Sequence, residues 1–142
     1  MRIKKTMSGI GAVLLVYPVA FLLPFFTGLI YGESFFSLVI IFLIPAALSL
    51  SLGAFLTEWG EWKLRKELEL RPAEALMVVA LSWIFIAVIG AFPYMLNGVL
   101  PHFVASYFES MSGFTTTGAS VITEIDGLER SILIWRAFTQ WL

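Results

Sequence analysis

Three long stretches without a charged side chain most constrain what this chain can fold into. They run from Met7 to Gly32, from Ser34 to Thr57 and from Ala75 to Phe108. A helix that crosses the hydrocarbon core of a bilayer needs about 20 mostly apolar residues, so each stretch is long enough to hold one. Charged residues make up 13% of the chain, against about a quarter in soluble domains. The sequence therefore predicts an all-α integral membrane protein.

The first two stretches predict a helical pair. We expect helices over Met7–Ile30 and Phe35–Thr57, joined by a tight hairpin at Tyr31–Ser34 in which Ser34 caps the second helix. Pro45 predicts a kink in that second helix. A secretory signal peptide is the alternative for the N-terminus, but its apolar region would be only about 7–15 residues long. The run here is longer and has no convincing cleavage site before Glu33, so a retained helix is expected.

A charged linker separates this pair from the rest of the chain. It covers Glu58–Arg71, and its tryptophans Trp59 and Trp62 are typical of the membrane–water interface. The third helix is predicted over Ala73–Leu96, with Pro72 in its first turn, where proline is well tolerated.

The pattern changes after Asn97–Pro101. A helix over Pro101–Gly113 would be roughly 20 Å long, too short for a ~30 Å hydrocarbon core. The following residues, Phe114–Val121, read as an extended segment of up to about 26 Å. A half-length helix with an extended return predicts a re-entrant loop. A last helix begins near Ser131 and is still apolar at Leu142.

An extended segment at membrane depth needs a reason, because non-helical backbone persists there only inside protein or along a watery cavity. One reason is to present carbonyl oxygens to a dehydrated cation, as potassium-channel filters do. Gly118 reaches backbone angles closed to other residues, and the run Thr115–Thr117 favours extended backbone. Gly113 is expected to end the short helix, whose partly negative C-terminus favours a cation beyond it.

The charges predict the topology. Basic residues precede the first helix and fill the linker: Arg2, Lys4, Lys5, Lys63, Arg65, Lys66 and Arg71. The region from Asn97 to Glu129 has none and carries only acids: Glu109, Glu124, Asp126 and Glu129. The positive-inside rule places the N-terminus and the linker in the cytoplasm and the re-entrant segment outside. Arg130 and Arg136, at the start of the last helix, are exceptions.

Three segments of the chain carry a family resemblance. "FESMSGFTTTGASV", from Phe108 to Val121, resembles the first filter segment of the Trk/Ktr/HKT superfamily of potassium transporters. "RPAEALMVVALSWIFIAVIGAFPYML" resembles the outer helix before that filter, and "ILIWRAFTQWL" resembles the start of the inner helix. The two preceding helices are similar to the extra N-terminal pair of the bacterial Trk membrane subunit.

The resemblance implies a division into residues 1–57, an N-terminal helical pair; residues 58–72, a cytoplasmic linker; and residues 73–142, a truncated first pore repeat. In the family, four helix–pore loop–helix repeats in one polypeptide surround one pore. Only one filter is found here, so the chain resembles the first quarter to third of a subunit.

The resemblance also implies the site. Potassium would be coordinated by the backbone carbonyls of Thr116, Thr117, Gly118 and Ala119, with Thr115 beside them. Glycine at this filter position accompanies potassium selectivity in the family, and serine goes with sodium preference in some plant relatives. Potassium would be the transported substrate, with no bound cofactor. The implied setting is a prokaryotic cell membrane, with lipid, a second subunit copy and a cytoplasmic nucleotide-binding regulatory subunit as partners.

Several alternatives stay open at this level. Glu109 either forms structural hydrogen bonds or attracts cations, and Arg136 either balances an acid of the pore loop or snorkels to the interface. Tyr107 and Phe108 are expected to pack against the outer helices. A sodium-permeable relative and an inactive structural fragment are the rival functions.

A membrane enzyme is a further alternative, with Glu109 and His102 as acid and base. The chain has no nucleophile motif, phosphate loop or metal-ligand cluster, and it has no cysteine for disulfides or thiol chemistry. Since His102 follows Pro101, it is expected at the interface, near the start of the short helix. No nucleic-acid partner is predicted.

Overall fold

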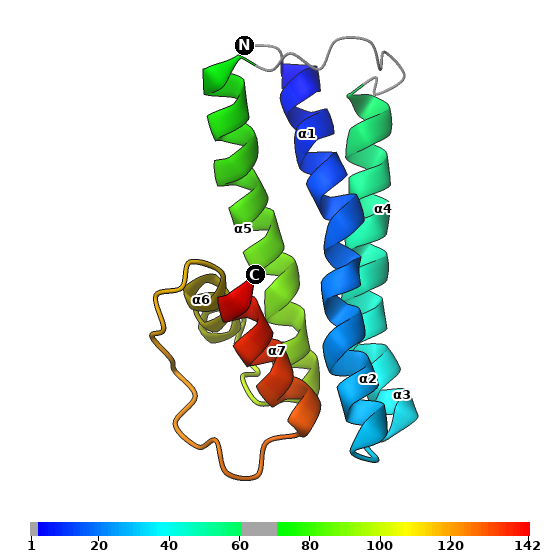
Figure 1. The fold of residues 1–142 in the computed structure, drawn as a ribbon, viewed down its shortest axis with the longest axis vertical. Coiled ribbons are helices and arrows are strands. Elements are labelled where there is room, and N and C mark those ends of the chain that lie inside the picture. The colour runs from blue at the N-terminus through cyan, green and yellow to red at the C-terminus, as the bar shows by residue number, and fades with distance from the viewer. Residues whose placement is uncertain (1–2, 61–70) are drawn as a thin grey trace.

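A computed structural model describes residues 3–60 and 71–142, and within these ranges the chain forms helices and no strand (Figure 1). In chain order the elements are α1 (Ile3–Val16), the 3-10 helix η1 (Tyr17–Phe21), α2 (Leu22–Ile30), α3 (Phe35–Leu38), the π-helix η2 (Val39–Leu43), α4 (Ile44–Trp59), α5 (Pro72–Asn97), α6 (Phe103–Phe114) and α7 (Arg130–Trp141).

Three continuous helical rods are long and apolar enough to cross a membrane. They cover Ile3–Ile30, Phe35–Trp59 and Pro72–Asn97. The prediction of an all-α membrane protein is confirmed, although the first rod begins four residues before the predicted Met7. The second rod continues to Trp59, two residues into the predicted linker. Most of that linker, residues 61–70, lies outside the described residues.

Proline and π-helical geometry explain where the rods depart from α-helix. The 3-10 segment η1 contains Pro18, which cannot donate an N–H to the helical ladder. Near Pro45, where a kink is predicted, the structure has the π-helix η2, immediately before that proline. There the N–H of Ile44 donates to the carbonyl of Val39, five residues back, so the helix is widened by one turn of π geometry.

Small residues bring α1 and α4 into close contact. A Cβ placed on Gly11 would lie 2.8 Å from the carbonyl oxygen of Gly53, and one placed on Gly53 would lie 2.9 Å from the backbone nitrogen of Leu15. The buried hydroxyl of Ser49 donates to the carbonyl of Leu14 at 2.7 Å. Because lipid chains are as apolar as leucine, such close packing and interhelical hydrogen bonds drive helix association in membranes.

The interior is centred on Trp135 of α7, which is fully buried. Its ring stacks on Phe21 with centroids 4.7 Å apart, and it meets Phe42 and Phe114 edge-on. Its indole N–H donates to the carbonyl of Gly90 at 3.1 Å. One side chain therefore joins the first helical pair, α5 and α6.

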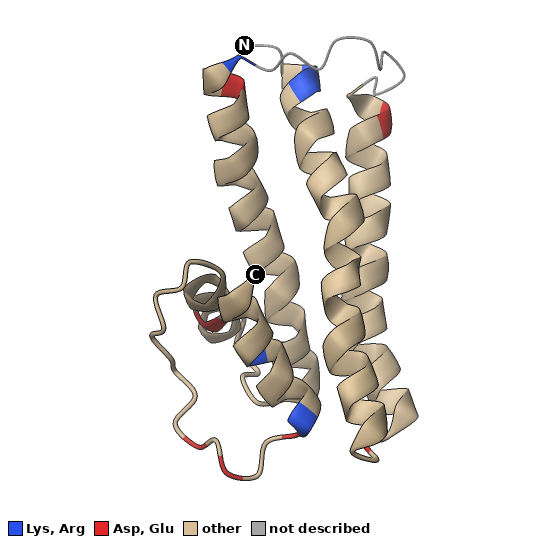
Figure 2. Ribbon diagram, viewed as in Figure 1, with Lys and Arg blue, Asp and Glu red and all other residues tan. Residues whose placement is uncertain are grey.

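Charges of both signs lie at both ends of the bundle, in different proportions (Figure 2). The basic residues at the starts of α1 and α5 lie at one end together with Glu58 and Glu74, and the acidic segment between α6 and α7 lies at the other end together with Arg130 at the start of α7. The hairpin between α2 and α3 shares the acidic end, where Glu33 lies (Figure 1).

Candidate pore loop and its supports

The short helix α6 runs back along α5 from its end. The Ser106 hydroxyl donates to the carbonyl of Leu100, just after α5, and a Cβ on Gly90 would meet Ser110 Oγ and Phe114. Gly90 lies about 10 Å along α5 from its end, at ~1.5 Å per residue. Residues 115–129 then lead back to the end from which α6 came, where α7 begins (Figure 1).

Gly113 does not end α6, so that prediction is wrong. The helix continues through Phe114, and Thr115 is its C-cap. A Cβ on Gly113 would overlap the side chain of Thr139 on α7. This glycine is therefore explained by close approach of two helices rather than by chain reversal.

The end of α6 is a Schellman motif with a threonine in the left-handed position. The N–H of Thr116 donates to the carbonyl of Gly113 at 2.9 Å, and that of Thr117 donates to Ser112 at 3.0 Å. Thr116 has a φ of +53°, where glycine is usual. A side chain with a Cβ costs roughly 1–2 kcal/mol there, and such strain clusters at functional sites.

The predicted extended segment is accordingly shorter than Phe114–Val121. Phe114 is helical, Thr115 and Thr116 form the capping turn, and the irregular chain begins at Thr117. Gly118 has a φ of +75°, whereas Thr117 between the two left-handed residues does not have a positive φ. The sign of φ thus alternates along residues 116–118.

Hydroxyl groups tie this turn to α6. Ser112 donates to the carbonyl of Ala119 at 2.6 Å, and Thr115 donates to the carbonyl of Met111 at 2.8 Å. The hydroxyls of Thr115 and Thr117 are also 2.8 Å apart, within hydrogen-bond distance. The side chains of the motif are used to hold the backbone in place.

A buried carboxylate holds the residues that follow. Glu109 is only 4% exposed and accepts the Ser120 hydroxyl at 3.0 Å, the Val121 N–H at 2.9 Å and the Arg136 Nε–H at 2.9 Å. Arg136, on α7, supplies the compensating charge. These contacts support a structural role for Glu109 and an acid-balancing role for Arg136.

The predicted filter residues lie on an open face of the described chain. Thr115 is half-buried, while Thr116, Thr117, Gly118 and Ala119 are exposed. Behind them, α6 presents its buried side, made of small polar residues and Glu109: Ser106, Glu109, Ser110, Ser112 and Gly113. The loop therefore has one supported side and one free side.

His102 and Glu109 do not form an acid–base pair. His102 is the exposed N-cap residue of α6, and Glu109 lies about 10 Å further along the helix at ~1.5 Å per residue. Within residues 3–60 and 71–142 no cluster of His, Asp or Glu side chains is suited to a metal ion. Tyr107 is half-buried, but Phe108 is exposed. The predicted packing of Phe108 against the outer helices is therefore not seen among the described residues.

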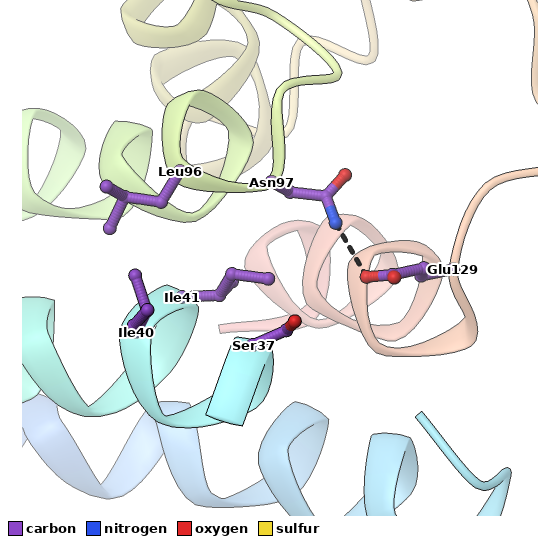
Figure 3. Close-up of a pocket in the computed structure, with 6 residues that line it drawn as sticks. All are labelled: Ser37, Ile40, Ile41, Leu96, Asn97 and Glu129. Carbon is purple, nitrogen blue, oxygen red and sulfur yellow. Dashed lines mark hydrogen bonds between the residues drawn. The ribbon is translucent and has the colours of Figure 1, made fainter. Parts of the chain in front are cut away.

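A separate small cavity lies at the acidic end of the bundle (Figure 3). It has a volume of about 170 Å³, and none of the filter residues lines it. Its walls come from α3, η2, the end of α5 and the residue before α7: Ser37, Ile40, Ile41, Leu96, Asn97 and Glu129. The Asn97 amide donates to Glu129 Oε2 at 2.6 Å across it.

Residues that sequence reasoning missed lie on either side of the motif. Ser112 holds the loop by donating to the Ala119 carbonyl, and Ser120 does so by donating to Glu109. The side chain of Thr139 lies against Gly113. A signal was present, because Ser106, Ser110 and Gly113 recur at helical spacing with Glu109 on one face of a short helix. That pattern is typical of a helix packed closely against its neighbours.

These features define a multi-pass helical membrane protein whose candidate site is made of backbone. Comparison with known proteins supplies the family: residues 33–142 match the model of TrkH, described as a cation transport protein. The chain belongs to this family of membrane transporters and is not an enzyme. The resemblance to the Trk/Ktr/HKT superfamily is thereby confirmed.

Individual relatives agree with the family match. The chain is 32% identical to an uncharacterized cation transporter of Methanocaldococcus jannaschii, over 98% of this chain and 28% of that protein. It is 31% identical to the Trk system potassium uptake protein TrkH of Halomonas elongata, over 100% of this chain and 28% of that protein. It is 32% identical to the Trk system potassium uptake protein TrkG of Escherichia coli, over 89% of this chain and 25% of that protein. The chain thus spans about a quarter of the length of these relatives.

Proposed function

We propose that this chain forms the first pore repeat of a potassium uptake transporter and that Thr115–Ala119 line the ion path. The observation that carries the proposal is the positive φ of both Thr116 and Gly118 on the free side of the loop. Relatives named as potassium uptake proteins support the choice of ion.

The positive φ values matter because they change where carbonyls point. In a regular strand, neighbouring carbonyls face opposite ways, so a row of carbonyls on one side requires backbone that departs from a regular strand, as it does at Thr116 and Gly118. A row of aligned carbonyl oxygens can replace the hydration shell of a potassium ion. The strained φ of Thr116 and the bond from the Val121 N–H to Glu109 support a backbone held for that purpose. Because the Ala119 carbonyl accepts the Ser112 hydroxyl, the carbonyls of Thr116, Thr117 and Gly118 are those proposed to coordinate the ion most directly.

The short helix adds an electrostatic contribution. The C-terminus of α6 leads directly into the loop, and a helix C-terminus carries roughly half a negative charge. A cation beside Thr116 and Thr117 would be favoured by that charge. The neighbouring Glu109 is neutralised by Arg136, so the ion would be coordinated by main-chain oxygens rather than by a carboxylate.

The direction of transport follows from the proposed orientation. With the basic end in the cytoplasm, the loop enters and leaves from the outer side as a re-entrant segment. Potassium would shed water at the loop and move inward down the membrane potential, worth ~2.3 kcal/mol per charge per 100 mV. The setting is the cell membrane of a prokaryote.

The assembly belongs to the same proposal. One repeat cannot enclose a pore, and relatives are about four times longer, so this chain would act as the N-terminal portion of a longer subunit. A homodimer of that subunit and a cytoplasmic nucleotide-binding partner are the proposed associations. The competing functions are an inactive structural fragment and a sodium-permeable relative, and Gly118 favours potassium over the latter.

The test is growth of a potassium-uptake-deficient strain at limiting potassium. A version extended beyond Leu142 by the remaining repeats is expected to restore growth, and residues 1–142 alone are not, because a single repeat leaves the loop facing lipid or solvent. Membrane content of both proteins is measured by immunoblot as the control. An extended protein that reaches the membrane and gives no potassium-dependent growth would overturn the proposal.

A further inference from the structure

The hairpin between α2 and α3 holds Glu33 in a fixed position. The N–H of Glu33 donates to the carbonyl of Gly28 at 2.9 Å and that of Gly32 to Leu29 at 3.2 Å, which makes a Schellman motif with Gly32 at a φ of +78°. Glycine occupies the left-handed position here, in contrast to Thr116. The backbone of Glu33 is therefore set without strain.

From this position Glu33 reaches the start of α7. Its Oε1 accepts the backbone N–H of Ser131 at 3.0 Å, a contact between residues 98 positions apart. Ser131 is the second residue of α7, and the first N–H groups of a helix have no partner within the helix. A carboxylate there both accepts the bond and complements the positive end of the helix dipole.

The residue that would ordinarily make this cap is engaged elsewhere. Glu129 is the N-cap of α7, yet its side chain makes no capping bond and instead accepts the amide of Asn97, as Figure 3 shows. Glu33, from a different part of the chain, takes its place. The first turn of α7 thus depends on the helical pair that precedes the pore repeat.

The surrounding residues fit this contact. A Cβ on Gly28 would lie 2.7 Å from Glu33 Oε2, so glycine leaves room for the carboxylate. The guanidinium carbon of Arg130 lies 5.9 Å from the centre of the Tyr31 ring, a cation–π distance. Two residues of the hairpin therefore engage two successive residues of α7.

The position of α7 in turn bears on the loop. Arg136 of α7 donates to Glu109. Glu109 also accepts hydrogen bonds from Ser120 and Val121, the residues directly after the proposed filter. A continuous series of hydrogen bonds and one helix therefore leads from Glu33 to the loop.

We propose that Glu33 is a positioning residue: the hairpin Tyr31–Glu33 clamps the start of α7 and, through Arg136 and Glu109, keeps residues 115–119 in their ion-binding geometry. The clamp itself stands on the contacts above. Its effect on ion selectivity rests on the proposed function.

The clamp is tested by hydrogen–deuterium exchange on the full-length protein. Glu33→Ala is expected to speed exchange in the first turn of α7 about tenfold, the usual effect of losing a cap. The α2 turn is made by backbone groups, so this variant keeps its fold. Glu33→Gln keeps the acceptor oxygen and replaces only Oε2, which has no partner among the described residues. The exchange rate in the first turn of α7 should therefore stay within about threefold of the wild-type rate.

Ion selectivity is measured on the same proteins in liposomes. Glu33→Ala is expected to lower the preference for potassium over sodium, and Glu33→Gln to restore it. Glu124→Ala, which removes an exposed acid from the same end, is the matched control and should change neither readout.

The outcomes separate the two claims. Unchanged exchange in Glu33→Ala refutes the clamp, and faster exchange with unchanged selectivity refutes its link to the filter. A wild-type protein without potassium selectivity refutes the proposed function instead, and the exchange result still decides the clamp.

Discussion

Glu109→Ala is expected to destabilise the protein by about 3 kcal/mol, because removing one partner of a buried ion pair leaves the other charge uncompensated. We take the lower end of the usual range, since the Arg136 side chain is 22% exposed and keeps some hydration. The variant also releases the Ser120 hydroxyl and the Val121 N–H, so the potassium uptake proposed for the full-length protein should fall with stability. Thermal unfolding in detergent, together with uptake into liposomes, measures both effects.

A double variant sharpens this prediction. Glu109→Leu combined with Arg136→Leu removes both charges and should recover part of the stability lost by Glu109→Leu alone. It should not recover uptake, because Ser120 and Val121 remain without their acceptor. Unfolding of Glu109→Ala at the wild-type temperature would show that the carboxylate does not hold the loop.

Gly118→Ser is expected to reduce the preference for potassium over sodium about tenfold in the full-length protein, with a loss of stability no larger than the backbone strain. A Cβ at Gly118 would meet no atom of the described chain within 4 Å, so the effect is conformational and not steric. At a φ of +75° the side chain costs roughly 1–2 kcal/mol, and rotating the peptide to relieve this strain would turn a carbonyl away from the ion. About 1.4 kcal/mol corresponds to a tenfold change in relative binding.

Gly127→Ser is the matched control for this substitution. Gly127 also has a positive φ, +101°, and open space around its Cβ, but it lies in the turn before α7. The same strain there should leave selectivity unchanged. Equal selectivity in wild type and Gly118→Ser, measured as competing uptake of the two ions, would count against the filter assignment.

The long helices could be predicted because their ends are marked by local signals. The first charge-free stretch begins at Met7 and ends before Glu33, and the second ends before Glu58. A glycine follows within a few residues of each predicted helix end. The predicted spans therefore agree with the observed helices to within a few residues. The half-length α6 was predictable for the same reason, since Pro101 and the threonine run bound it.

What the sequence could not predict depends on contacts between distant segments. Gly113 looked like a helix end because nothing local reveals Thr139 beside it. Glu33 looked like a hairpin residue, since its partner Ser131 is 98 positions away. The left-handed φ of Thr116 runs against its own preference for extended backbone, and the bonds around α6 override that preference.

The alternative roles of Glu109 and Arg136 also required coordinates. Considered alone, Glu109 also fits a role in attracting cations, and Arg136 also fits an interfacial position. Their separation of 2.9 Å, together with the burial of Glu109, is what favours mutual neutralisation.

The central claim, that main-chain oxygens of residues 115–119 replace the water of a potassium ion, is tested most directly by locating the ion. Crystals of the full-length protein grown in thallium, a potassium mimic with strong anomalous scattering, should show a peak on the free side of the loop, in contact with these carbonyl oxygens. The peak should disappear in sodium. Thallium bound instead to a carboxylate such as Glu109, or no peak beside Thr116–Ala119, would contradict the account.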